Sequence, residues 1–285
     1  MTGPSRPRRG ANSTSRIPRR RAKNARTCAG IASSSTTWVR RYLPDPPTVA
    51  TLRPQEITPG SGCAIASNTI SWPSAVEKQK QMKFDKFKTL ATSEDTPIKP
   101  ERVVAELQKV LDKDAIVVAD PGTPCPYFSS YYIVRGTGRR YFSNRAHGAL
   151  GYSLAASIGA HFGRPKVKTV AVMGDGSFGM CVGELETAVR LKLPITFVVI
   201  SNAVYGWIKA GQKTGYAERY FSVDFGVTDH AKVAQAFGVK AFRVFDPLKL
   251  SSVLKEAVNS GEPTLVDIVC QPLQEAKAPV SEWVA

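Results

Sequence analysis

The chain has 285 residues, of which 42% are hydrophobic and 22% are charged, so we expect a sizeable folded core rather than global disorder. Its longest apolar stretches, such as 194–200, fall well short of the roughly 18 residues that a membrane-spanning helix needs, which excludes an integral membrane protein. The net charge is +16, but residues 1–75 hold 12 Lys/Arg against 2 Asp/Glu and so supply +10 of it. The remaining chain is only mildly basic.

The first 75 residues differ in composition from the rest. They hold nine of the 20 prolines and no acidic residue before Asp45, and they show no sustained period of 2 or 3.6. Such a segment cannot bury enough apolar surface to offset its chain entropy, so we predict a disordered basic tail over residues 1–75. An Arg- and Ser-rich composition is also typical of organelle targeting, the alternative to the cytoplasmic location that we expect. No aromatic residue is interleaved with the charges of the first 26 residues, so a nucleic-acid partner is disfavoured.

Secondary-structure patterns begin after the tail. We predict a linker over residues 76–96, which contains a charged helix over Val76–Leu90. Apolar spacing then predicts a helix over Glu101–Leu111. Beyond it, apolar runs alternate with helical patterns. We predict strands at 115–119, 168–173, 195–200, 241–245 and 264–269, and helices at 150–162, 182–191, 229–237 and 248–260. The runs are apolar on both faces, so we predict one doubly wound α/β domain with a parallel sheet over residues 97–285.

The loop after the 168–173 strand carries a glycine-rich motif. Residues 174–179 read G-D-G-S-F-G and match the G-x-G-x-x-G pattern of nicotinamide-dinucleotide sites. Two features argue against such a site. The next strand ends in Ser201-Asn202, where a dinucleotide site needs an acidic residue for the ribose. Asp175 also places a carboxylate in the turn that would hold the pyrophosphate.

A divalent cation would reconcile Asp175 with a phosphate. Two anions a few ångströms apart repel by about 4 kcal/mol at an effective dielectric constant near 20. An Mg²⁺ ion between them attracts both and turns this repulsion into a net attraction. Asn202 lies 27 residues after Asp175, at the end of the next predicted strand, so both side chains can reach one ion. The alternative is a plain strand–helix turn with Asn202 as a loop residue.

These motifs resemble a known family. The sequence GDG, then 24 residues, then Ser201-Asn202 resembles the GDG…NN signature of thiamine-diphosphate enzymes. The resemblance runs from about Pro97 to Ala285 and is greatest to the C-terminal, diphosphate-binding domain of the acetolactate synthase-like branch. PIKPERVV at the domain start, residues 148–151 (GALG) and residues 229–238 (DHAKVAQAFG) support it.

The resemblance implies thiamine diphosphate and Mg²⁺ as cofactors and a role for each matching residue. Asp175 and Asn202 would hold Mg²⁺ by their side chains, and Val204 by its backbone carbonyl. The implied donors to the diphosphate are Gly122, Thr123, Gly176 and Ser177. The Gly148 carbonyl would accept from the aminopyrimidine, and Leu150 would be the apolar wedge that bends the cofactor. Further residues expected at the cofactor are Ala149, Gly174, Tyr205 and Gly206.

This sequence also departs from the family. Ser201 replaces the first Asn of the pair, Pro124 stands where acetolactate synthases carry a His near the diphosphate, and Gly211 stands where they carry a substrate-selecting Trp. The identity of the 2-keto acid substrate is therefore open. Trp207 and Lys209 either contact substrate or pack and solvate a helix. His147 has either a structural role or a role in proton transfer.

The resemblance finally implies that activity needs more than this domain. In the family, a glutamate that activates the cofactor comes from a separate pyrimidine-binding domain, and no segment of this sequence matches that domain. We therefore expect half of a 2-keto-acid decarboxylase or carboligase, completed by another chain in a homo- or hetero-oligomer. The alternatives are a non-catalytic cofactor-binding module or truncated product, and a basic-tailed nucleic-acid binder.

Overall fold

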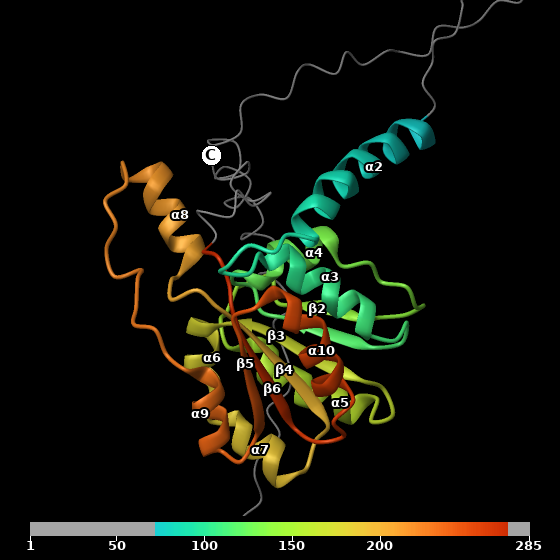
Figure 1. Cartoon of the computed structure of the whole chain (residues 1–285), viewed down its shortest axis with the longest axis vertical. Helices are drawn as coiled ribbons and strands as arrows, with labels where there is room; N and C mark the ends of the chain where they lie inside the picture. The colour runs from blue at the N-terminus through green and yellow to red at the C-terminus, as the bar shows by residue number, and fades with distance from the viewer. Residues whose placement is uncertain (1–71, 273–285) are drawn as a thin grey trace, which may run out of the picture. The chain divides into compact units, whose positions relative to one another are not determined.

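The computed structural model describes residues 72–272, and these form an α/β domain (Figure 1). The predicted tail lies outside the described residues, except that its last residues belong to a helix that begins at Trp72. The helices are α2 (Trp72–Ala91), α3 (Pro100–Val110), α4 (Pro124–Tyr131), α5 (Tyr152–Gly163), α6 (Asp175–Cys181), α7 (Glu184–Arg190), α8 (Gly206–Gly215), α9 (His230–Ala236) and α10 (Pro247–Val258). The strands are β1 (Ile116–Ala119), β2 (Tyr141–Ser143), β3 (Thr169–Gly174), β4 (Ile195–Ser201), β5 (Lys240–Val244) and β6 (Thr264–Val269).

The strands between residues 72 and 272 form one parallel sheet of six, in the order β2-β1-β3-β4-β6-β5. Each strand is joined to the next through at least one helix, as parallel pairing requires. After β1 the chain first adds β2 on one side of the sheet and then returns to add β3 on the other. This reversal leaves a crevice between the carboxyl ends of β1 and β3, the usual place for a ligand in an open α/β sheet.

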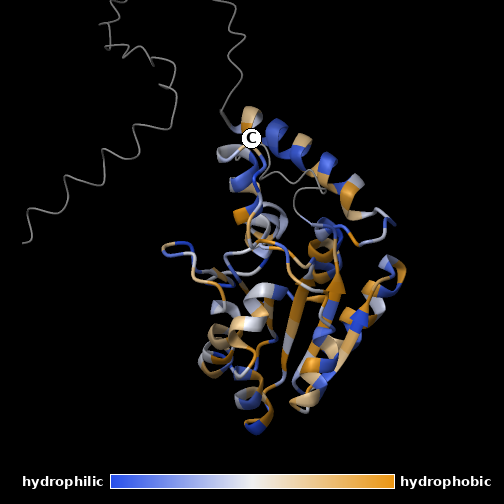
Figure 2. Ribbon diagram, turned by 90° about the vertical axis from the view of Figure 1, so that its left-hand side faces the viewer, coloured by the Kyte–Doolittle hydropathy of each residue, from blue (hydrophilic) through white to orange (hydrophobic). Residues whose placement is uncertain are grey.

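Helices cover both faces of the sheet, which confirms the predicted doubly wound α/β class. Alternate residues along each strand enter two separate hydrophobic clusters, as the period of 2 requires. In β3, for example, Val170 and Val172 belong to the cluster that includes α3, α4 and α10, whereas Ala171 and Met173 belong to the cluster that includes α5, α6, α7 and α9. The central strands β3 and β4 are therefore buried along their whole length, and Figure 2 shows orange strands in the middle of the fold.

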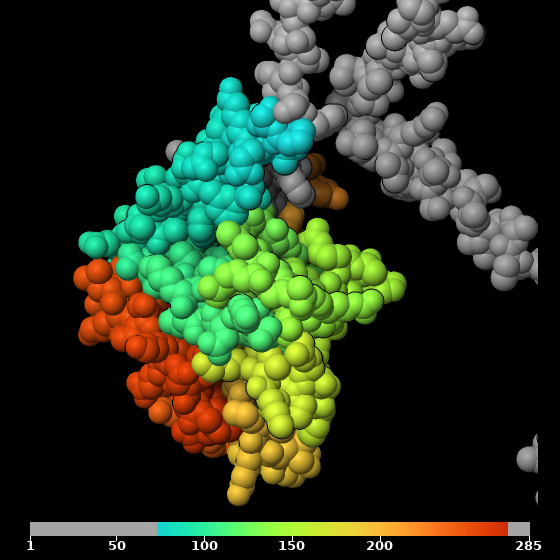
Figure 3. All heavy atoms as spheres, turned by 90° about the vertical axis from the view of Figure 1, so that its right-hand side faces the viewer, coloured from blue at the N-terminus to red at the C-terminus, as the bar shows by residue number. Residues whose placement is uncertain are grey.

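Segments far apart in the sequence lie side by side on the face of the sheet that α3, α4 and α10 cover. Helix α3, near the start of the domain, packs against α10, near its end (Figure 3). Helix α2 joins this face through Phe87, whose ring stacks on Tyr131 with centroids 4.3 Å apart. In the described part of the chain, no helix combines the length and the apolar character that crossing a bilayer demands.

Most predicted elements are confirmed within a few residues at each end. The structure adds β2, α4, α6 and α8, which the sequence patterns did not indicate. The glycine-rich loop itself is helical from Asp175 to Cys181, and α5 begins at Tyr152 rather than at residue 150. Leu150 therefore lies in the loop before the helix.

Candidate functional site

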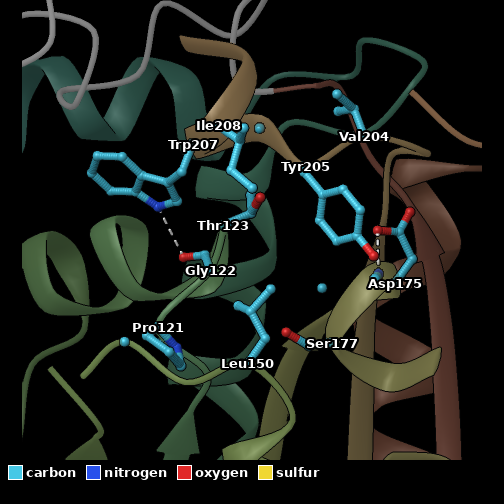
Figure 4. A pocket seen from close by; sticks show the side chains of 14 residues that line it. Pro121, Gly122, Thr123, Leu150, Asp175, Ser177, Val204, Tyr205, Trp207 and Ile208 are labelled. Carbon is cyan, nitrogen blue, oxygen red and sulfur yellow. Dashed lines mark hydrogen bonds between the residues drawn. The ribbon is translucent and has the colours of Figure 1, made fainter. Parts of the chain in front are cut away.

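A cavity of about 200 Å³ opens at the crevice between β1 and β3 (Figure 4). Four segments contribute to it: the loop after β1, the loop before α5, the start of α6, and the turn between β4 and α8. Its lining residues are Pro121, Gly122, Thr123, Gly148, Leu150, Gly174, Asp175, Gly176, Ser177, Val204, Tyr205, Gly206, Trp207 and Ile208. We call it the main cavity.

The main cavity brings together nearly all of the residues that the sequence predicted to form a cofactor site. Two predicted residues do not line it. Ala149 lies in the same loop as Gly148 and Leu150 but does not line the cavity, and Asn202 lines a neighbouring cavity that also contains Asp175.

Asp175 is buried at the boundary between these two cavities, with 4% of its surface exposed. Its Oδ2 accepts hydrogen bonds from the backbone N–H groups of Asn202 (2.7 Å) and Ala203 (2.6 Å), and its Oδ1 accepts from that of Gly176 (2.8 Å). Burial raises the pKa of Asp175, and the three N–H donors oppose this rise. Among residues 72–272, no lysine or arginine pairs with the Asp175 carboxylate.

The turn after β4 is held against Asp175. Ala203 has a φ of 55°, in the left-handed region that a residue with a Cβ enters at a cost of about 1–2 kcal/mol. The Asp175 carboxylate accepts from this residue and its predecessor, so it stabilises the strained turn. Such strain is concentrated at functional sites.

Close contacts at two glycines narrow the main cavity. A Cβ on Gly122 would come within 3.2 Å of Leu150 Cδ2, and Figure 4 shows Leu150 between Gly122 and Ser177. A Cβ on Gly176 would lie only 2.4 Å from the ring of Tyr205, so this position must be a glycine for the ring to pack over the loop. At Gly174, by contrast, a Cβ would meet nothing within 4 Å.

Asp120 is a site residue that the sequence analysis missed. It follows β1, is fully buried, and its carboxylate accepts from the N–H groups of Gly151 (3.1 Å) and Ser153 (3.0 Å) and from the hydroxyls of Ser153 (2.7 Å) and Ser177 (3.3 Å). One carboxylate thus joins the end of β1 to the loop that carries Leu150 and to α6. Its position directly after a buried strand, at the edge of the sheet where ligands bind, could have indicated Asp120 from the sequence.

Ser201 lines the neighbouring cavity with Asn202 and Asp175 but does not line the main cavity. Its hydroxyl donates to Oδ1 of Asp267 and pairs with Nδ1 of His230 at 2.9 Å, and the backbone N–H of His230 donates to the same carboxylate. Asp267 is fully buried in β6. These contacts tie the ends of β4 and β6 to α9 outside the main cavity.

The residues at Asp175 suit a hard divalent cation. In the described region, no three His, Cys, Asp or Glu side chains gather as a metal site. The expected Mg²⁺ site differs from that pattern because it combines one carboxylate, one amide and one backbone carbonyl. The carboxylate is buried without a lysine or arginine partner from the described residues, and the Asn202 amide has a buried Nδ2 with no partner among them. Since an amide can be turned over to present its oxygen, Asp175 and Asn202 fit the oxygen ligands that Mg²⁺ prefers.

Comparison with known proteins gives a consistent result. Residues 120–268 match the family described as "Thiamine pyrophosphate enzyme, C-terminal TPP binding domain". The chain is 33% identical over 185 residues to a protein named "Probable acetolactate synthase large subunit" from Methanococcus aeolicus, covering 63% of this chain and 31% of that protein. It is 36% identical over 169 residues to an "Acetolactate synthase" from Bacillus subtilis, covering 59% of this chain and 29% of that protein.

A solved structure shares the fold. The Rhodococcus jostii RHA1 thiamine diphosphate-dependent 4-hydroxybenzoylformate decarboxylase superimposes with a TM-score of 0.59 at 24% identity, over 63% of this chain and 34% of that one. The chain thus spans about a third of the length of the curated relatives named above. The family match covers both the loop after β1 and the GDG loop, and its residues form the main cavity. This chain belongs to the family of thiamine pyrophosphate enzyme C-terminal, TPP-binding domains.

Proposed function

We propose that this chain binds thiamine diphosphate and Mg²⁺ in the main cavity and serves as the diphosphate-binding half of an acetolactate synthase-like 2-keto-acid decarboxylase or carboligase. The observation that carries the proposal is the buried Asp175 carboxylate, which pairs with no lysine or arginine among the described residues and borders a cavity between two glycine-containing loops. Family membership and the likeness to acetolactate synthases support it.

Each part of the cavity has a task in this proposal. Asp175, Asn202 and the Val204 carbonyl would hold Mg²⁺, with phosphate oxygens and water as its other ligands. Gly122, Thr123 and Ser177 would bind the diphosphate. The N–H of Gly176 already donates to Asp175, so its part is to orient the carboxylate. Leu150 would shape the bound cofactor, and Gly148 would accept from its amino group.

Thiamine diphosphate, when bound, supplies the electron sink for cleavage next to a keto group. The chain's own residues bind the cofactor, orient it and exclude water from it. We further propose that the glutamate needed for cofactor activation comes from a pyrimidine-binding domain of another polypeptide, within a homo- or hetero-oligomer.

Calorimetry with the full chain tests the binding proposal. Thiamine diphosphate should bind when Mg²⁺ is present, and removal of the metal with EDTA should abolish binding, because the phosphates would then face the Asp175 carboxylate directly. Absence of binding, or affinity that does not depend on the metal, would contradict the proposal.

A decarboxylation assay tests the need for a partner. The purified chain with thiamine diphosphate and Mg²⁺ should release no carbon dioxide from pyruvate or from 2-oxoglutarate. Robust turnover by this chain alone would show that no partner is required.

A further inference from the structure

A second cavity of about 290 Å³ adjoins the main cavity. It is lined by Pro121, Arg145, Ala146, His147, Gly148 and Trp207, and it shares Pro121, Gly148 and Trp207 with the main cavity. We call it the side cavity. A molecule bound next to Gly148 can therefore extend from one cavity into the other.

Arg145 gives the side cavity a positive charge. Arg145 and His147 are exposed side chains in the loop between β2 and α5. Within residues 72–272 neither forms an ion pair with a carboxylate, and the guanidinium of Arg145 makes one hydrogen bond, from Nη1 to the buried thiol of Cys125 at 3.3 Å. This contact orients the Arg145 side chain and leaves most of its five N–H donors without an acceptor from the described residues.

Trp207 lines both cavities, and a hydrogen bond orients its indole ring. Trp207 lies at the start of α8, and its indole Nε1 donates to the backbone carbonyl of Gly122 at 3.2 Å (Figure 4). Since Gly122 belongs to the loop expected to bind the diphosphate, the indole is held in register with the cofactor site. A flat apolar wall beside a guanidinium suits a ligand with a carbon chain that ends in an anionic group.

We infer that the side cavity binds a second carboxylate of the substrate, remote from the keto acid group, so that the preferred substrate is a 2-keto dicarboxylic acid. This inference rests on the proposed function. The carboxylate that leaves as carbon dioxide loses its charge during the reaction, and a guanidinium paired with it would stabilise the ground state more than the transition state. Arg145 is therefore suited to a carboxylate that keeps its charge throughout.

The diphosphate of the cofactor does not account for the charge of Arg145. Its expected ligands Gly122, Thr123 and Ser177 line the main cavity and are absent from the lining of the side cavity. The two cavities thus offer separate sites for the two anionic molecules, with Gly148 and Trp207 between them.

Binding of two matched ligands tests the inference. The full chain is titrated with 2-oxoglutarate and with 5-methyl-2-oxohexanoate, in which an isopropyl group replaces the distal carboxylate. We expect about tenfold tighter binding of 2-oxoglutarate, as one charge-assisted hydrogen-bonded pair would give. Arg145→Gln should remove this preference and Arg145→Lys should keep part of it. Arg139→Gln, which changes an exposed arginine before β2 that lines neither cavity, should leave it unchanged.

The titrations are repeated with and without thiamine diphosphate and Mg²⁺, whose own binding is measured on the same samples. The side cavity exists without the cofactor, so the preference is expected in both conditions. Equal affinity of the wild-type chain for the two ligands, or a preference that survives Arg145→Gln, overturns the inference even if the cofactor binds. Failure of the cofactor to bind contradicts the proposed function and leaves the 2-oxoglutarate comparison readable.

Discussion

At the scale of single residues, Asp175 joins three parts of the site. Its carboxylate fixes the turn after β4, orients the first turn of α6 and borders the main cavity. Any ligand with phosphate groups must approach this negative charge, so the effect of Asp175 on binding depends on whether a cation lies between them.

Asp175→Asn should lower the affinity for thiamine diphosphate at least about a hundredfold in the presence of Mg²⁺, because an amide replaces the charged ligand of the ion. Calorimetry measures this change, and circular dichroism checks the fold. Asp112→Asn removes an exposed carboxylate that pairs with Lys168, and should leave the affinity unchanged. If the Asp175→Asn variant bound the cofactor as tightly as the wild type, Asp175 would not be a metal ligand.

Asp120 positions the loop that carries Leu150. In the wild type, the donors around Asp120 share two carboxylate oxygens, whereas Asp120→Asn leaves them a single acceptor oxygen. We therefore expect the free energy of unfolding to fall by about 1–3 kcal/mol. The affinity for thiamine diphosphate should fall with it. Urea denaturation and calorimetry measure the two effects.

A matched variant separates stability from binding in that experiment. Asp246 accepts from the N–H of Leu248 at the start of α10, so Asp246→Ala should cost about 1 kcal/mol of stability without any loss of cofactor affinity. Equal losses of affinity in both variants would show that the Asp120 effect is a general consequence of destabilisation.

The sequence predicted Asp175 because its carboxylate stands in a glycine-rich turn suited to phosphate, where a divalent cation would have to lie between the two anions. Asp120 follows a buried strand in the same way, but its partners Gly151, Ser153 and Ser177 come from two other segments, and no spacing along the chain indicates such contacts. The orientation of the Asn202 side chain was equally inaccessible, since it depends on the turn at Ala203.

At the scale of secondary-structure elements, α3 carries a buried acidic group that the site does not use. Glu101 is fully buried in the first turn of α3, and neither carboxyl oxygen has a side-chain hydrogen-bond partner among the described residues. Burial raises the pKa of Glu101 above its ordinary value of 4.5. The folded state therefore favours the protonated form.

The stability that this protonated form contributes is present below pH 4.5 and is lost as the pH rises through the raised pKa. Glu101→Gln removes the titration. The variant should match the wild type near pH 4 and exceed its free energy of unfolding by about 1–2 kcal/mol near pH 8. Urea denaturation across this range measures the difference, and Glu94→Gln, on an exposed residue, should show no such trend. A difference that is constant with pH would contradict the prediction.

The elements that the sequence patterns missed have weak local signals. Strand β2 has three half-buried residues, α4 contains two prolines, and α8 contains three glycines in ten residues. Their conformations follow from tertiary contacts, such as the hydrogen bond from Trp207 in α8 to Gly122. The long buried strands β3 and β4 were predictable because both of their faces are apolar.

At the scale of the whole domain, the residues that stabilise the fold and the residues that line the main cavity occupy different parts of the sheet. The two hydrophobic clusters lie on opposite faces, whereas the main cavity lies at one end of the strands. Trp207 packs against the first cluster and also lines the main cavity, whereas Leu254 belongs to the same cluster and does not line the cavity. A core residue such as Leu254 can therefore be changed without changing the lining of the site.

Leu254→Ala in α10 tests this separation. Leu254 is fully buried in the first cluster, so its truncation should lower the free energy of unfolding by about 2–5 kcal/mol. Cofactor affinity should stay within about twofold of the wild type under conditions where the variant is folded, as calorimetry would show. A loss of affinity comparable with that of Asp175→Asn would mean that the core and the site are coupled.

Electron paramagnetic resonance with Mn²⁺ in place of Mg²⁺ tests the central claim most directly. Mn²⁺ and thiamine diphosphate together should give a bound-metal signal with coupling to the phosphorus nuclei of the diphosphate, and Asp175→Asn should abolish it. A bound-metal signal without phosphorus coupling, or one that persists in the variant, would contradict the account in which Asp175 and the diphosphate share one cation.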